Sequence, residues 1–196
     1  MLNHRIFFAT LATGLIAIAP AFAQNAAPKA TTPPASTSLA QAPLPDRTTA
    51  SFGDWTMRCE RRRDSGTPVK LCELSQAIQR AGDAGPLAQL AVGRVAASDP
   101  MKLTVVLPLN VALAAAPKVA ADTKDGPSMQ TTWQRCIPAG CLASATLSDD
   151  LLKKLRVAGE TGKLDYRDAG DREVSLPFSL RGLPEALDAL TRESTN

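Results

Sequence analysis

Hydrophobic and polar residues alternate along much of the chain after residue 50, which is the pattern of β-strands that bury one face. In the clearest run, hydrophobic side chains stand at every second position from Val174 to Leu180. Pro177 lies inside this run and predicts an edge strand or a bulge, because proline cannot donate a ladder hydrogen bond. The same period of two predicts strands over residues 55–60, 69–76, 87–96, 101–107, 128–136, 141–147 and 163–167.

Two short segments near the C-terminus change to helical spacing. Ser148 suits an N-cap, Asp149 and Asp150 suit the positive end of the helix dipole, and Gly159 can end that helix. The second helix is expected over residues 183–190, where leucines recur on one face. Many strands separated by turns and followed by two short helices predict a mainly β fold, an antiparallel β-sandwich.

The first residues depart from the strand pattern. His4 and Arg5 precede an apolar run over residues 6–19, and the run ends in a small-residue cleavage pattern at Ala23. This arrangement is typical of a secretory signal peptide, so residues 1–23 are expected to be removed. We therefore expect an exported protein without a transmembrane segment in its mature form, located in the periplasm or at the outer membrane or cell surface.

The next segment, residues 24–50, is rich in Pro, Ala and Thr and has no aromatic residue. Such a composition buries too little apolar surface to offset the entropy of ordering, so we predict a disordered tether. The tether is either a plain linker or a spacer that holds the domain away from a membrane, a cell wall or a partner. One folded domain is expected over residues 51–191, and residues 192–196 form a tail.

Four cysteines in an exported chain predict disulfide bonds. Of the three pairings, we favour Cys59 with Cys72, because they lie on neighbouring predicted strands joined by a basic, turn-rich loop. The second favoured pair is Cys136 with Cys141, because Ile-Pro-Ala-Gly between them is a turn sequence. A structural staple is the preferred interpretation of this pair. A redox-active pair and a metal site are the alternatives, although neither the Cys-x-x-Cys redox motif nor a zinc spacing is present.

The amino-acid composition excludes several kinds of catalytic and metal-binding site. The chain has 22 Lys and Arg, 19 Asp and Glu, and a single histidine, His4, which lies in the predicted leader. Because the mature protein would then lack histidine, catalysis by Ser-His-Asp or Cys-His nucleophiles and zinc binding by histidine are excluded. No nucleotide or nucleophile-elbow motif occurs, and we expect no cofactor and no metal. Carboxylate catalysis leaves no spacing signature, but Asp149 and Asp150 are best explained as helix-start residues.

The one basic cluster is Arg61, Arg62 and Arg63. A solvated loop is the simplest interpretation of three consecutive arginines. The alternative is contact with an acidic surface, such as lipid head groups or an anionic polymer. Because no aromatic residues are interleaved with them, nucleic acid is not expected as a partner.

Several motifs together resemble the invasion-associated locus B family. They are FGDWTMRCE from Phe52, LCELSQ from Leu71, RCIPAGC from Arg135, LSDDLLKKLRVAG from Leu147 and LPFSLRGLPEAL from Leu176. The resemblance implies an exported, non-enzymatic, β-rich protein of Gram-negative bacteria, in a family first linked to entry into host cells. It also implies structural roles for the four cysteines and for Trp55, Gln76, Gly140, Ser179 and Gly182. Leu183 departs from the family pattern, in which a Phe is expected directly after Gly182.

The sequence thus predicts an exported, non-enzymatic interaction protein whose partner belongs to the envelope or to a host surface. The alternative is a periplasmic enzyme or thiol oxidoreductase that uses carboxylates or the Cys136 and Cys141 pair. A passive periplasmic stress or assembly factor is a third hypothesis and differs from the first only in its partner.

Overall fold

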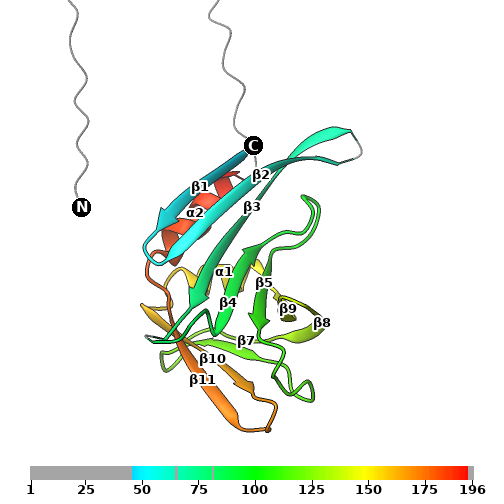
Figure 1. Ribbon diagram of the computed structural model, residues 1–196. Helices are drawn as coiled ribbons and strands as arrows, with labels where there is room; N and C mark the ends of the chain where they lie inside the picture. The colour runs from blue at the N-terminus through cyan, green and yellow to red at the C-terminus, as the bar shows by residue number, and fades with distance from the viewer. Residues whose placement is uncertain (1–45, 65, 81, 194–196) are drawn as a thin grey trace, which may run out of the picture. The chain divides into compact units, whose positions relative to one another are not determined.

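The computed structural model describes residues 46–193 except residues 65 and 81. Two antiparallel sheets and two short helices make up this part of the chain, so the predicted mainly β fold is confirmed (Figure 1). In chain order the elements are β1 (Arg47–Phe52), β2 (Trp55–Asp64), β3 (Thr67–Ile78), β4 (Ala88–Gly93), β5 (Lys102–Leu107), β6 (Lys118–Ala121), β7 (Ser128–Gln130), β8 (Thr132–Ile137), β9 (Gly140–Thr146), α1 (Asp149–Leu155), β10 (Thr161–Arg167), β11 (Glu173–Ser179) and α2 (Leu183–Glu193).

The large sheet has seven strands in the order β1-β2-β3-β4-β5-β9-β8, and the small sheet has four in the order β11-β10-β6-β7. The inner strands of the large sheet turn alternate residues toward one buried face, as Leu74, Leu90 and Val105 show. In the small sheet the corresponding residues include Val119 and Leu164. The buried residues of both sheets and both helices form a single hydrophobic cluster. We call the opposite, solvent-facing side of the large sheet its outer face.

Helix α2 closes the core. It buries Leu183, Leu187 and Leu190 on one face and contacts strands β1, β2 and β3. Figure 1 shows α2, in red, beside the cyan strands β1 and β2. Helix α1 begins as expected, because the Ser148 hydroxyl accepts the Leu151 N–H at 3.2 Å. The burial of α2 against three strands fixes the C-terminal part of the chain on the sheet.

Four details of the secondary structure differ from the prediction. Strand β1 begins at Arg47, inside the segment predicted as a tether. It was missed because its polar side chains show no hydrophobic pattern, and only its backbone pairing with β2 reveals it. Strand β6 was not predicted, and the strand expected over residues 128–136 is two strands, β7 and β8, in different sheets. Helix α2 continues past residue 191. Pro177 does lie on an edge strand, β11. The predicted signal peptide and the rest of the tether lie outside the described residues.

A buried glutamine joins the two sheets. Gln76 is 8% exposed and occupies an inward position of β3. Its Nε2 donates to the main-chain oxygens of Asp54 and Ser179, both at 3.1 Å, and its Oε1 accepts the Ser179 N–H at 3.2 Å. Trp55 Nε1 donates to the same Ser179 oxygen at 3.1 Å. We call Asp54, Trp55, Gln76 and Ser179 the glutamine clamp, because their bonds connect the first turn, β3 and the end of β11.

Two glycines allow the turns beside the clamp to touch through their backbones. A Cβ atom on Gly182 (φ 82°) would lie 2.1 Å from the Phe52 oxygen, and one on Gly53 (φ 54°) would lie 2.6 Å from the Arg181 oxygen. The Asp54 N–H donates to that Arg181 oxygen at 3.2 Å. The Arg181 guanidinium also donates to the Asp54 carboxylate, with Nη2 at 2.8 Å from Oδ2. Only glycine permits this approach at both positions.

We expect Gln76→Ala to lower the free energy of unfolding by about 3 kcal/mol. The truncation leaves the Ser179 N–H and the Asp54 oxygen without their partner, and an unpaired buried polar group costs about 1–3 kcal/mol. Urea unfolding followed by tryptophan fluorescence measures the change. Gln134→Ala is the matched control, because the Gln134 amide is exposed and donates only to Thr132 on its own strand. Equal stability of the two variants would show that the clamp is dispensable.

Acid should weaken the contact between Asp54 and Arg181. The hydrogen bond from the Ser179 hydroxyl, together with that from Arg181, holds the pKa of Asp54 below its ordinary value. The unfolded chain therefore takes up this proton first as the pH falls. The stabilisation is complete above the ordinary aspartate pKa, about 3.9, and is lost as the pH falls from there through the folded-state pKa.

Asp54→Asn should therefore lose less stability than the wild type when urea unfolding is repeated from pH 6 down to pH 3. Asp83→Asn should follow the wild-type curve, because the Asp83 carboxylate is exposed and makes no hydrogen bond or ion pair to a described residue. Parallel curves for Asp54→Asn and the wild type would contradict the assigned role of Asp54.

Candidate functional site

The structure divides the three consecutive arginines between the two faces of β2. Alternation along the strand places Arg62 on the outer face with Glu60, and Arg61 and Arg63 on the side that carries Cys59. Arg62 Nη2 lies 2.8 Å from Glu60 Oε2, and Arg47 Nε lies 2.8 Å from Glu60 Oε1. The hydrogen bond from Arg62 and the charge of Arg47 lower the pKa of Glu60. Alternation thus separates Arg62 from Arg61 and Arg63 on the strand, although all three are exposed and line one shared hollow with Arg47 and Asp46.

A hollow on the outer face collects further charged side chains. It has a volume of about 310 Å³ and lies beside β2 and β3. Three arginines, Arg58, Arg62 and Arg94, line it together with the carboxylates of Glu60 and Glu73. Because Glu60 is already engaged by Arg62, the hollow offers more positive than negative charge to a ligand. We call it the arginine hollow.

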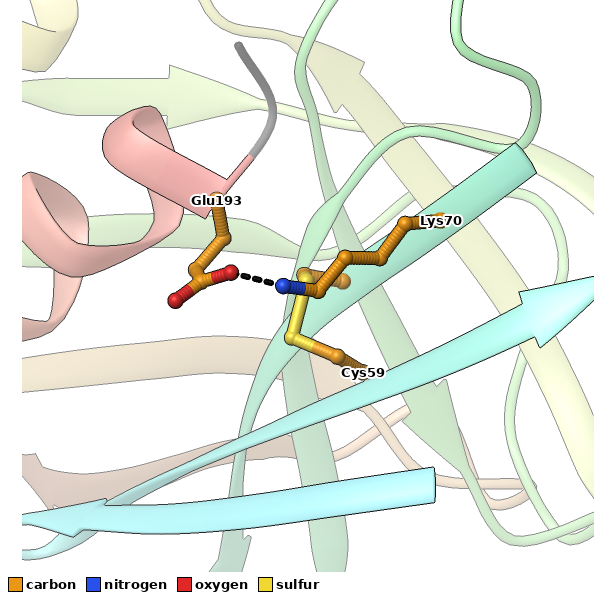
Figure 2. Close-up of a disulfide and its surroundings, with 4 residues drawn as sticks. Cys59, Lys70 and Glu193 are labelled. Atoms are coloured by element: carbon orange, nitrogen blue, oxygen red, sulfur yellow. Dashed lines mark hydrogen bonds and ion pairs between the residues drawn. A yellow bond between two sulfur atoms is a disulfide. The ribbon is translucent and has the colours of Figure 1, made fainter. Parts of the chain in front are cut away.

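An ion pair between a lysine and a glutamate covers the first disulfide. Cys59 and Cys72 are opposite each other on β2 and β3, with Cα atoms 4.0 Å apart, and both residues are buried. Figure 2 shows Lys70, from β3, reaching across this disulfide to Glu193 at the end of α2. A Glu193 carboxylate oxygen and the two sulfurs lie within 4.8 Å of one another. Since the sulfurs are bonded to each other, this cluster is a covered staple and not a set of thiolate metal ligands.

The second disulfide closes the β8–β9 hairpin. Cys136 and Cys141 are register partners with Cα atoms 3.9 Å apart. Gly140 has φ 141°, and a Cβ atom there would lie 2.4 Å from the Leu107 oxygen, so the turn needs a glycine. Cys141 is buried, whereas Cys136 is exposed. The sequence Ile-Pro-Ala-Gly therefore forms a turn between two bonded cysteines.

Carboxylates with a shifted pKa in the described residues are held by arginines. Asp54 and Glu60 are described above, and the Arg172 side chain, with its main-chain N–H, lowers the pKa of Asp168. A general acid at neutral pH needs the opposite shift. Asp149 and Asp150 lie in the first turn of α1, and Asp150 Oδ1 is 3.5 Å from Lys153 Nζ. These carboxylates serve as ion-pair and helix-start groups.

Besides the cysteines, the family resemblance gives structural roles to five residues, and four of them meet at one place. Trp55, Gln76 and Ser179 form the glutamine clamp with Asp54, and Gly182 lies at the adjoining turn. Gly140 belongs to the distant β8–β9 turn. The sequence contained one signal of the clamp, a glutamine at an inward position of an alternating strand. The contact between Lys70 and Glu193 had no such signal, because the two residues are far apart in the chain.

None of the helices within residues 46–193, gaps at 65 and 81 aside, is long and apolar enough to cross a membrane.

Comparisons with known proteins agree on one family. The family model described as "Invasion associated locus B (IalB) protein" matches residues 55–191. Two Brucella abortus proteins, invasion protein B homologues of strain 2308 and of biovar 1 strain 9-941, are each 25% identical over 140 residues, which cover 71% of this chain and 77% of theirs. The crystal structure of invasion associated protein B from Bartonella henselae superposes with a TM-score of 0.63 at 20% identity, covering 76% of this chain and 97% of that one. This last likeness shows a shared fold.

We expect Glu193→Gln to speed the reduction of the Cys59–Cys72 disulfide by dithiothreitol about fivefold. The Glu193 carboxylate lies beside both sulfurs and pairs with Lys70, so its removal leaves the Lys70 ammonium there to attract an attacking thiolate. Two charges 4 Å apart in water interact by about 1 kcal/mol. Timed alkylation followed by peptide mass spectrometry measures both disulfides in one sample. The Cys136–Cys141 bond is the internal control, and Glu185→Gln, in the first turn of the same helix, is the matched variant. An unchanged rate would mean that burial alone protects this disulfide.

Proposed function

This chain belongs to the invasion associated locus B family, and from this premise we propose that it is an exported protein that acts by binding an acidic component of a cell surface or envelope, without catalysis. The observation that carries the proposal is the state of its cysteines. All four are joined in two disulfides, each across a hairpin. Disulfides of this kind persist in oxidising compartments outside the cytoplasm. The predicted signal peptide supports the same location.

Binding is supported by the exposed positive charge on β2. Arg61 and Arg63 project beyond the Cys59–Cys72 staple, and Arg58 and Arg62 line the arginine hollow on the other face. Guanidinium groups pair with carboxylate, sulfate and phosphate groups through two parallel hydrogen bonds. The Brucella abortus relatives are called invasion protein B homologues, so a role in contact with host cells is the form of binding that we propose.

A second candidate function rests on one observation, the unequal burial of the hairpin cysteines. Cys136 is exposed and Cys141 is buried, an arrangement that would let an outside thiol attack one sulfur of the pair. A thiol oxidoreductase would lose its activity when both are replaced by serine, and its stability would change little. A staple would instead lose about 2 kcal/mol of stability with binding retained.

The location of the domain is the first test of the proposal. An epitope placed after Asn196 is followed while protease is added to intact cells, to cells with a permeabilised outer membrane and to lysed cells. We expect the epitope to be cut before the inner membrane is broken, because the disulfides require an oxidising compartment. Cutting on intact cells indicates the surface, and cutting only after permeabilisation indicates the periplasm. Protection until lysis, with a cytoplasmic protein bearing the same epitope as the control, would contradict export.

A further inference from the structure

One row of small residues crosses the whole outer face of the large sheet. Each of the seven strands contributes one residue, and the register joins each to its neighbour. Six of the seven carry a hydroxyl group. In order across the sheet they are Ser51, Thr56, Ser75, Ala91, Thr104, Ser144 and Thr132. We call this set the hydroxyl row.

The hydroxyl groups of this row have no hydrogen-bond partner among the described residues. Within the part of the chain that the structure describes, none of the six side-chain hydroxyls makes a hydrogen bond, whereas the hydroxyls of Thr131, Ser148 and Ser175 do. Neighbouring strands are about 4.8 Å apart, so the row extends about 29 Å across the sheet. It therefore offers a line of donors and acceptors, interrupted at Ala91, to a partner outside.

Positive charge flanks the row. Arg58 and Lys102 occupy the adjacent register row, which also holds Glu73, and Arg135 lies on the other side of the hydroxyl row, opposite Leu142 on β9. Neither Arg58 nor Lys102 lies within 4.0 Å of a carboxylate oxygen of a described residue, so both charges are available to a ligand. The arginine hollow opens at the β2–β3 end of the same face. This face therefore combines unpaired hydroxyls with unpaired cations.

A sugar polymer with acidic groups matches both features. Its successive rings present hydroxyls that can exchange hydrogen bonds with the row, and its carboxylate or sulfate groups can pair with arginine and lysine. Single-stranded nucleic acid would need aromatic side chains for base stacking, and the residues of the row and its flanks include none. A lipid surface would need large, well-exposed apolar side chains there, whereas the row carries only small ones and Val106 and Leu142 in the adjacent row are half-buried.

We propose that the outer face of the large sheet binds an extended acidic polysaccharide of the host cell surface, with the hydroxyl row along the chain of sugars and Arg58 and Lys102 at its acidic groups. This proposal rests on the proposed function, because it names the partner of an exported binding protein. It assigns the contact to residues other than Arg61 and Arg63, which lie on the opposite side of β2.

Binding to dextran sulfate tests the proposal directly. The mature chain is titrated against immobilised dextran sulfate, uncharged dextran and polyphosphate at fixed salt. We expect dextran sulfate to bind more tightly than polyphosphate and uncharged dextran not to bind. Equal binding to polyphosphate would mean that charge alone is recognised and would overturn the sugar contact. Self-association of the free chain through this face, seen by light scattering and abolished by Arg58→Gln, would also overturn the proposal.

Two pairs of substitutions separate the hydroxyls from the charges. Thr56→Val with Thr104→Val removes two hydroxyls of the row while keeping shape and strand propensity, and should weaken binding to dextran sulfate roughly tenfold. Arg58→Gln with Lys102→Gln should weaken it by at least as much. Lys118→Gln with Lys124→Gln makes the same charge change on the small-sheet side and should leave affinity within about twofold. Thermal unfolding confirms that each variant is folded.

The outcomes distinguish this inference from the proposed function. The polysaccharide site is wrong if the Thr56→Val, Thr104→Val variant binds as the wild type does. It is also wrong if the Lys118→Gln, Lys124→Gln control loses as much affinity as Arg58→Gln with Lys102→Gln. Neither result contradicts the proposal that the domain is exported. Protection of the epitope until cells are lysed would overturn both. Binding of the purified chain to cultured host cells should fall after their sulfated glycans are removed enzymatically, and undiminished binding would overturn the host polysaccharide as the partner.

Discussion

Two sheets that meet at an angle leave main-chain groups at the meeting point without a strand partner, and each such buried group costs about 1–3 kcal/mol when unpaired. Here β11 ends against β3, and the Gln76 side chain supplies both a donor and an acceptor to Ser179 as a neighbouring strand would. The same amide reaches the Asp54 oxygen in the first turn. The Gln76 side chain therefore fixes the end of β11 against both the large sheet and the first turn, and the Trp55 and Arg181 hydrogen bonds reinforce the same junction.

The structure around the clamp holds these hydrogen bonds in place. Gly53 and Gly182 allow two turns to approach backbone to backbone, and α2 starts immediately after that contact. The two disulfides lie away from the clamp, one beneath the end of α2 and one at the β8–β9 turn. The core is thus held by the hydrogen bonds of the clamp between the two sheets and by two disulfides within the large sheet, which suits a domain with few aromatic residues.

Strands with strong alternation could be predicted from the sequence, and strands whose side chains are polar or small could not. The run from Val174 to Leu180 and the leucines of α2 were unambiguous, whereas β1 pairs through its backbone with side chains that show no pattern. The separation of Arg62 from Arg61 and Arg63 follows from the period of two and could have been predicted. The hydroxyl row could not, because it depends on the register of six strand pairs, and register across long loops is not encoded locally.

The two ends of the described chain lie together. Asp46, just before β1, and Glu193, at the end of α2, line one hollow of about 370 Å³ together with Lys70. Domains whose ends are adjacent tolerate circular permutation and insertion into other chains, because the join requires no long connection. This domain could therefore be placed within a surface loop of an unrelated carrier, with its outer face free and both attachment points on one side.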